Sequence, residues 1–205
     1  MIYGEEDLSA QLNEWKEFVE AYTNFTLNIT EIREPELTEI TYWEGYYEKD
    51  CYLATRENVN YNAIPKYNHI IILLWKLLEG QETCLAGGTW GGDWGIHDRP
   101  YGTIPYNVWW FDESYTHEGF NTHGAQIITH EFQNALRWII HTELSFPASS
   151  LPDPYAGACD GMTLAECYIS IFDAITDEMY SAIGSLFKRN VTFTSVPDGA
   201  TISLV

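Results

Sequence analysis

The sequence predicts an α+β domain in which helices pack on a mixed, twisted sheet. Three patterns indicate this class: helical spacing of apolar residues over 124–141, a continuous apolar run over 70–75, and alternation of apolar and polar residues over 25–30. A chain of 205 residues with 45% hydrophobic and 15% aromatic content can also bury a substantial core. We therefore expect one domain, residues 1–189, followed by an appendage, residues 190–205.

The N-terminal quarter begins with a helical pattern and then changes period. Asp7 or Ser9 is the expected cap, and apolar residues recur at helical spacing as far as Tyr22. Residues 25–30 alternate with the period of a half-buried strand. Residues 38–52 are rich in Tyr and Trp and either extend that strand or form a second helix, and the sequence leaves both open.

The middle of the chain carries the remaining strand patterns. Residues 70–75 form a short apolar run typical of a strand that is buried on both faces. The glycines of 84–95 exclude regular helix and allow tight turns or a close approach of the backbone. Residues 106–111 indicate another strand, at an edge of the sheet.

The C-terminal half is expected to be helical except for one loop. A largely buried helix spans 124–141, and three prolines make 145–160 a loop. A C-terminal helix follows from Thr163, with Lys188 and Arg189 placed favourably at its end.

Charge excludes some partners. The chain has 30 acidic and 10 basic residues and a formal charge of −20, which disfavours nucleic acid and anionic membranes. The longest apolar run is too short to span a bilayer, so we expect no membrane insertion.

Cysteines and sequons point to an extracellular or cell-surface location. The four cysteines are Cys51, Cys84, Cys159 and Cys167. No two of them have the C-x-x-C spacing, so two disulfides are expected, with Cys51–Cys84 and Cys159–Cys167 preferred among three connectivities.

Three N-x-[ST] sequons agree with that location and predict a glycoprotein. They begin at Asn24, Asn28 and Asn190. Because Met1 leads straight into a polar segment, we expect that an export signal has been removed.

The tail after Asn190 has a different composition. Residues 191–196 alternate like a strand, and Pro197, Asp198, Gly199 and Ala200 form a turn before a second strand. This tail resembles the start of the PEGA domain family, small β-sandwich modules found on cell-surface proteins. The resemblance implies that the natural protein continues beyond Val205.

The segment HEFQN, residues 130–134, carries the chemistry. In an H-E-x-x-H helix both histidines lie on one face and bind one Zn²⁺, while the Glu acts on the metal-bound water. The segment and the preceding order of buried strand, glycine-rich stretch, edge strand and helix resemble the zincin metallopeptidases. The resemblance implies a zincin-like domain that cleaves peptides or proteins, with Glu131 as general base and His130, position 134 and Glu166 as metal ligands.

Asn134 stands where the second histidine ligand belongs. An amide is a poor Zn²⁺ ligand, so Zn²⁺ binding should be weak or absent if Asn134 is native. Asn134 is therefore either an inactivating change in a peptidase or a natural feature of a non-peptidase descendant, or the motif arises by chance. In that last case His130 is a core histidine bonded to Asn134, and Glu131 is solvated.

Other residues could complete the site. Glu166 lies 36 residues after His130, as the third ligand of gluzincins would, although Thr163 and Glu166 also form a capping box. His117 and His123 could serve as accessory ligands or transition-state stabilisers. We expect a zinc-endopeptidase-like domain weakened by Asn134 or, alternatively, a non-catalytic zincin-shaped domain that binds or scaffolds at the cell surface.

Overall fold

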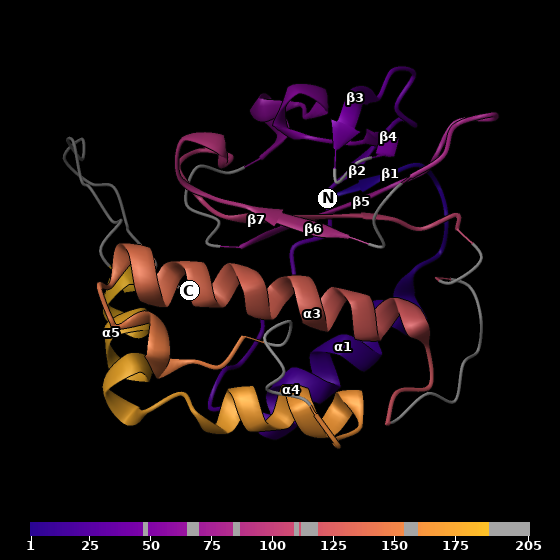
Figure 1. The fold of residues 1–205 in the computed structure, drawn as a ribbon. Helices are drawn as coiled ribbons and strands as arrows, with labels where there is room; N and C mark the ends of the chain where they lie inside the picture. Colours follow the sequence, from indigo (N-terminus) through magenta and orange to yellow (C-terminus); the bar gives the residue numbers. More distant parts are fainter. Residues whose placement is uncertain are drawn as a thin grey trace, which may run out of the picture.

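The computed structural model describes residues 1–46, 49–64, 70–83, 87–108, 111, 119–153 and 160–188. Over these residues the chain has the α+β class that the sequence predicts, with a mixed sheet and four α-helices. Figure 1 shows the sheet as one layer and the helices gathered on one of its faces.

The main sheet has five strands in the order β2-β1-β5-β7-β6. The strands are β1 Ile2–Tyr3, β2 Arg33–Glu34, β5 Ile71–Trp75, β6 Gly88–Trp90 and β7 Tyr101–Pro105. Neighbouring strands are parallel except for β6, which is antiparallel to β7 and forms one edge. The prediction of a buried strand at 70–75 is confirmed, because β5 is central and four of its five residues are buried.

A hairpin covers the sheet face opposite the helices (Figure 1). It consists of β3 Thr41–Tyr46 and β4 Lys49–Leu53, so within 38–52 these described residues form strands and no helix. The Trp75 indole nitrogen donates to Thr103 Oγ1 at 2.8 Å, and Thr103 Oγ1 donates to the Ala54 carbonyl at 2.7 Å. This buried relay joins β5 and β7 to the segment after β4.

The helical layer consists of α1 Ser9–Tyr22, α3 His123–Trp138, α4 Leu164–Asp173 and α5 Asp177–Lys188. The predicted helix at 124–141 is confirmed as α3, which continues as a π-helical turn over Ile139–Glu143. Its apolar residues join those of α1 and α4 in the main core, where the rings of Trp15 and Phe132 meet edge to face at 5.6 Å.

Two strand predictions are wrong. Residues 25–30 form no strand, and their alternation arises because Phe25 and Leu27 pack against the core while Thr26 and Asn28 face solvent. Side chains satisfy this backbone in place of a strand partner, since Glu20 accepts from the Leu27 amide at 2.7 Å.

The edge strand predicted at 106–111 is also displaced. The strand just before this range is β7, which lies between β5 and β6, and the edge strand next to it is β6 within the glycine-rich stretch. The apolar residues after β7, such as Val108 and Phe111, fill the core on the helical side instead. Apolar content alone could not distinguish these two roles.

The helix predicted from Thr163 is two helices. It breaks at Ala174–Thr176, and the Thr176 hydroxyl then accepts from the Met179 amide at 3.3 Å near the start of α5. The loop predicted at 145–160 holds for its described residues, 145–153 and 160, where only a short 3₁₀ turn occurs.

Several predictions lie outside the described residues. These are the PEGA-like tail 190–205, His117, Cys84 and Cys159. Cys51 and Cys167 are each disulfide-bonded, and the preferred pairing stays a prediction. Among the described helices, none is long and apolar enough to cross a bilayer.

Candidate functional site

The candidate site lies on α3, whose N-terminus is fixed by α1. Thr122 caps the helix by accepting from the Ala125 amide at 3.2 Å. Glu14 of α1 in turn accepts from the Thr122 amide at 2.9 Å and from its hydroxyl at 2.7 Å. A capping residue held by a carboxylate fixes where the helix begins and so fixes the positions of His130, Glu131 and Asn134.

Glu131 faces the edge of the sheet. Its side chain is only 2% exposed, and Thr89 of β6 donates to Oε2 at 2.6 Å. The same hydroxyl lies 3.2 Å from the Glu131 carbonyl. The edge strand thus contacts both the side chain and the backbone of this helical residue.

Two glycines make room for Glu131. A Cβ at Gly87 would lie 2.7 Å from Glu131 Oε1, and a Cβ at Gly102 would lie 2.9 Å from Glu131 Cβ. Neither position accepts a side chain without a shift of Glu131. The glycines therefore allow the close backbone approach that the sequence indicated, here between the sheet and α3.

Burial raises the pKa of the Glu131 carboxyl to about 7, against the opposing effect of hydrogen bonds from Thr89 and Asn134. A carboxyl group that titrates near neutrality has the acidity that suits general acid–base chemistry. Its burial, however, keeps it from direct contact with bulk solvent.

His130, the next residue back, faces α4. Its Nδ1 lies 3.4 Å from the hydroxyl of Tyr168. Burial lowers the pKa of His130 to about 4. The charge of Asp153 opposes this shift, and the charge of Arg137 adds to it. The imidazole is therefore neutral at physiological pH, which is the form that binds a metal.

Asn134 lies one turn after His130 and contacts Glu131 through its side chain. Residue 134 therefore lies beside the carboxyl that the resemblance assigns as general base. The chance-motif interpretation expected a solvated Glu131, and that expectation is wrong because Glu131 is buried.

Glu166 caps α4. Its Oε2 accepts from the Thr163 amide at 2.8 Å and lies 2.9 Å from the Thr163 hydroxyl, while the Thr163 hydroxyl accepts from the Glu166 amide at 3.2 Å. These bonds from Thr163 lower the pKa of the Glu166 carboxyl. The capping box is thus formed, and the role of Glu166 as a metal ligand stays a prediction.

The donor set does not fit a tight Zn²⁺ site. On α3 it offers one imidazole, one amide and a buried carboxyl that already bonds to Thr89 and Asn134. In the part of the chain that the structure describes, no three His, Cys, Asp or Glu side chains form a group that could hold a metal. His123, proposed as an accessory residue, is the first residue of α3, two turns before His130.

Three residues of the site escaped the sequence interpretation. Thr89, Gly102 and Tyr168 all contact the HEFQN segment from distant points of the chain. Thr89 left a weak signal, since it is a polar residue inside a glycine-rich stretch. Tyr168 left none, because only the packing of α4 on α3 brings it to His130.

Comparisons of this chain with family models, with curated proteins and with solved structures find no match. The geometry of the site therefore has to support the functional conclusion.

Proposed function

We propose that this chain is an extracellular, zinc-endopeptidase-like domain whose metal site is weakened or lost through Asn134. The observation that carries the proposal is the contact between Asn134 and the buried Glu131 carboxyl. Position 134 is one helical turn from His130, so a second imidazole there would share a face with the first. Asn134 instead supplies an amide, which hydrogen-bonds to the carboxyl and coordinates Zn²⁺ poorly.

The surrounding elements support a zincin-like arrangement. Buried β5, edge strand β6 within the glycine-rich stretch, strand β7 and helix α3 follow one another in the chain. The resemblance rests on the order of buried strand, glycine-rich stretch, edge strand and helix, and here the edge strand lies inside the glycine-rich stretch and β7 precedes the helix. The substrate class that this implies is a peptide or protein.

A second candidate function is a non-catalytic domain that binds or scaffolds at the cell surface. The burial of Glu131 favours it, because a general base must reach the proton that it removes. Thr89 and Asn134 hold the carboxyl in the helix–sheet interface in the present sequence.

The single substitution Asn134→His separates the two candidates. We expect the variant to bind Zn²⁺ more tightly than the wild type, by more than the roughly 10- to 100-fold that the loss of an outer-shell partner costs. Calorimetric titration of chelator-treated protein with Zn²⁺, together with elemental analysis, measures the gain. Cleavage of a mixed quenched-fluorescent peptide library tests for activity.

Two further variants are the controls. Asn134→Gln keeps an amide and should not gain zinc, and Asn134→His combined with His130→Ala should lose the gain. Recovery of both tight zinc binding and peptidase activity in Asn134→His would rule out the scaffold-only function. Absence of zinc binding in both the wild type and Asn134→His would overturn the zincin-like metal site.

A further inference from the structure

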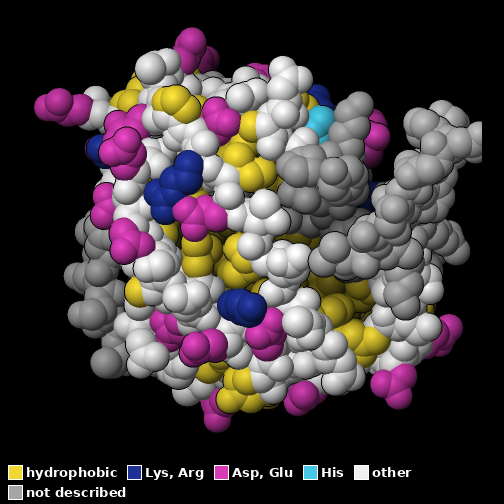
Figure 2. All heavy atoms as spheres, turned by 180° about the vertical axis from the view of Figure 1, so that it is seen from behind, with side chains coloured by type: hydrophobic (Ala, Val, Ile, Leu, Met, Phe, Trp, Pro, Cys, Tyr) yellow, Lys and Arg dark blue, Asp and Glu magenta, His cyan; other side chains and the backbone are white. Residues whose placement is uncertain are grey.

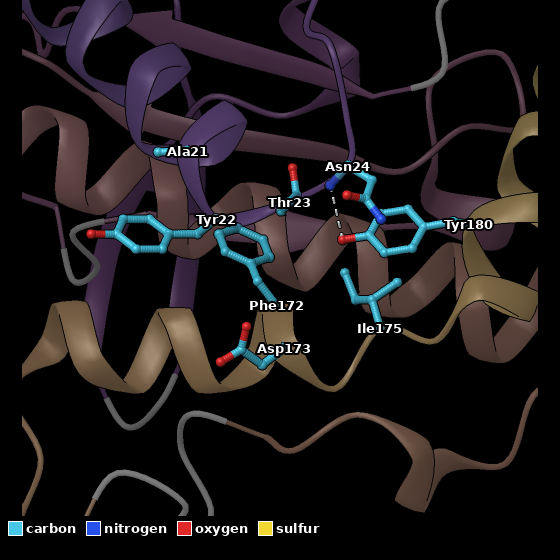
Figure 3. Close-up of a pocket in the computed structure, with 8 residues that line it drawn as sticks. All are labelled: Ala21, Tyr22, Thr23, Asn24, Phe172, Asp173, Ile175 and Tyr180. Atoms are coloured by element: carbon cyan, nitrogen blue, oxygen red, sulfur yellow. Dashed lines mark hydrogen bonds between the residues drawn. The ribbon is translucent and has the colours of Figure 1, made fainter.

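A groove of about 310 Å³ opens at the far end of the helical layer. Its described lining comes from the end of α1, the end of α4 and the start of α5, and Figure 3 shows these side chains around it. None of those lining residues belongs to the HEFQN segment. The groove is therefore separate from the proposed peptidase-like site.

Three aromatic rings form its walls. They belong to Tyr22, Phe172 and Tyr180, and Tyr22 is 43% exposed. The Tyr180 hydroxyl accepts from the Asn24 amide at 3.2 Å (Figure 3). The Tyr180 ring also packs against Phe25 at 4.9 Å, so it is held in place. Phe172 is buried, so Tyr22 and Tyr180 are the rings that a ligand in the groove can reach. The face of such a ring carries partial negative charge.

The one charged side chain in the described lining of the groove is acidic. Asp173 lines it, and its described lining includes no Lys, Arg or His. Helices α1 and α4 both end there, at Tyr22 and Asp173, and neither has a basic residue in its last turn. The partial negative charge of two helix C-termini is therefore not offset by a basic side chain of the helix itself.

The acidic charges also act on the aromatic wall. Burial raises the pKa of Tyr180 against the hydrogen bond from Asn24, and the charges of Asp173 and Asp177 raise it further. The phenol stays neutral at physiological pH. Figure 2, which shows the molecule from behind, also has acidic side chains spread over its surface, in keeping with the formal charge of −20.

We propose that this groove binds an organic ammonium group, which stacks on the Tyr22 and Tyr180 rings and is paired with Asp173. Aromatic faces combined with a carboxylate are the chemistry that recognises such cations. The ammonium can belong to a free amine or to a lysine side chain of a peptide, and both would use the same contacts.

The test is a titration of the whole chain, followed by NMR of the Tyr22, Phe172 and Tyr180 ring signals. The probes are choline, Nα-acetyl-lysine amide and 3,3-dimethylbutanol, which is the uncharged isostere of choline. We expect saturable shifts of these rings with one or both ammonium probes and none with the alcohol. The ammonium probe that saturates at the lower concentration identifies the source of the group.

Asp173→Asn should weaken binding roughly fivefold, as expected for one charge pair in a solvated groove. Tyr22→Leu should weaken it about threefold through loss of one ring face. Glu79→Gln is the matched control: it removes one charge from the turn after β5, in the sheet layer, and should leave affinity unchanged.

Three results would overturn the proposal. One is an equal response to the alcohol, which would make the groove merely apolar. Another is an equal loss of affinity in Glu79→Gln and Asp173→Asn, which would reduce the effect to overall charge. The third is the absence of any saturable shift in wild-type protein whose unfolding curve is cooperative.

Discussion

His130 and Glu131 are neighbours in the chain but face different parts of the fold. His130 contacts Tyr168 of α4, while Glu131 points to the sheet edge and contacts Thr89 of β6. Burial shifts the two pKa values in opposite directions, to about 4 for His130 and to about 7 for Glu131. In both cases the neutral form is favoured, because burial penalises whichever form is charged.

This contrast shows what each side of α3 requires. On the sheet side, close packing requires glycine, since Gly87 and Gly102 leave the space that Glu131 fills. The α4 side depends on polar side chains, since Gln126 and Gln133 also bond to Tyr168, at 3.3 Å to its hydroxyl and 2.8 Å to its carbonyl. Substitutions on the sheet side should therefore act through steric packing, and substitutions on the α4 side should act through hydrogen bonding.

The largest expected effect is on the pH dependence of stability. The unfolded Glu131 titrates near 4.5 and the folded one at about 7, so the folded state holds its proton more strongly. The stability that this provides is complete below pH 4.5 and is lost as pH rises to about 7, by about 3 kcal/mol. Urea denaturation from pH 4 to pH 8 should show this loss of stability in the wild type and not in Glu131→Gln.

His130 provides the opposite test. Its folded pKa of about 4 lies below the unfolded value of 6.5, so its contribution is complete above pH 6.5 and is lost as pH falls towards 4. In His130→Asn we expect stability to fall less on acidification than in the wild type. If both variants kept the wild-type pH profile, neither side chain would be buried as described.

The next effect concerns packing on the sheet side. A Cβ at Gly102 would lie 2.9 Å from Glu131 Cβ and 3.0 Å from Ile72 Cδ1, so Gly102→Ala forces the helix or the strand to shift. We expect a loss of about 1–3 kcal/mol in the free energy of unfolding. Thermal unfolding followed by circular dichroism measures it.

Gly184→Ala is the matched control for that substitution. A Cβ there meets nothing within 4 Å, and Gly184 lies inside α5. Helix propensity alone should then stabilise the protein, by about 0.5–1 kcal/mol. Equal effects of the two substitutions would contradict the close contact of Gly102 with α3.

The smallest expected effect is on the α4 side. Tyr168→Phe removes the hydroxyl near His130 Nδ1 and leaves the buried Gln126 amide without that partner. We expect a loss of about 1 kcal/mol and a changed imidazole environment in NMR spectra of His130, with the Glu131 pKa unaffected. Tyr42→Phe, at a ring that is 48% exposed, should cost less than half as much.

Helices were easier to predict from the sequence than strands in this chain. The pattern of α3 repeats over four turns, so its position follows from local spacing. The described strands are two to six residues long, and only β1 and β5 are purely apolar runs. The alternation at 25–30 shows the limit, because partial burial of Phe25 and Leu27 between exposed residues also occurs in a segment without a strand partner.

The sequence by itself determined the α+β class, the buried helix α3 and the choice of residues 130–134 as the candidate site, because each depends on local periodicity or on adjacent residues. Only the tertiary structure decided that Glu131 is buried beneath Thr89, that Tyr168 reaches His130 and that β6 is the sheet edge. The contacts of Tyr168 with His130 and of Thr89 with Glu131 join residues 38 and 42 positions apart. No local pattern encodes them, since they arise when helix and sheet pack together.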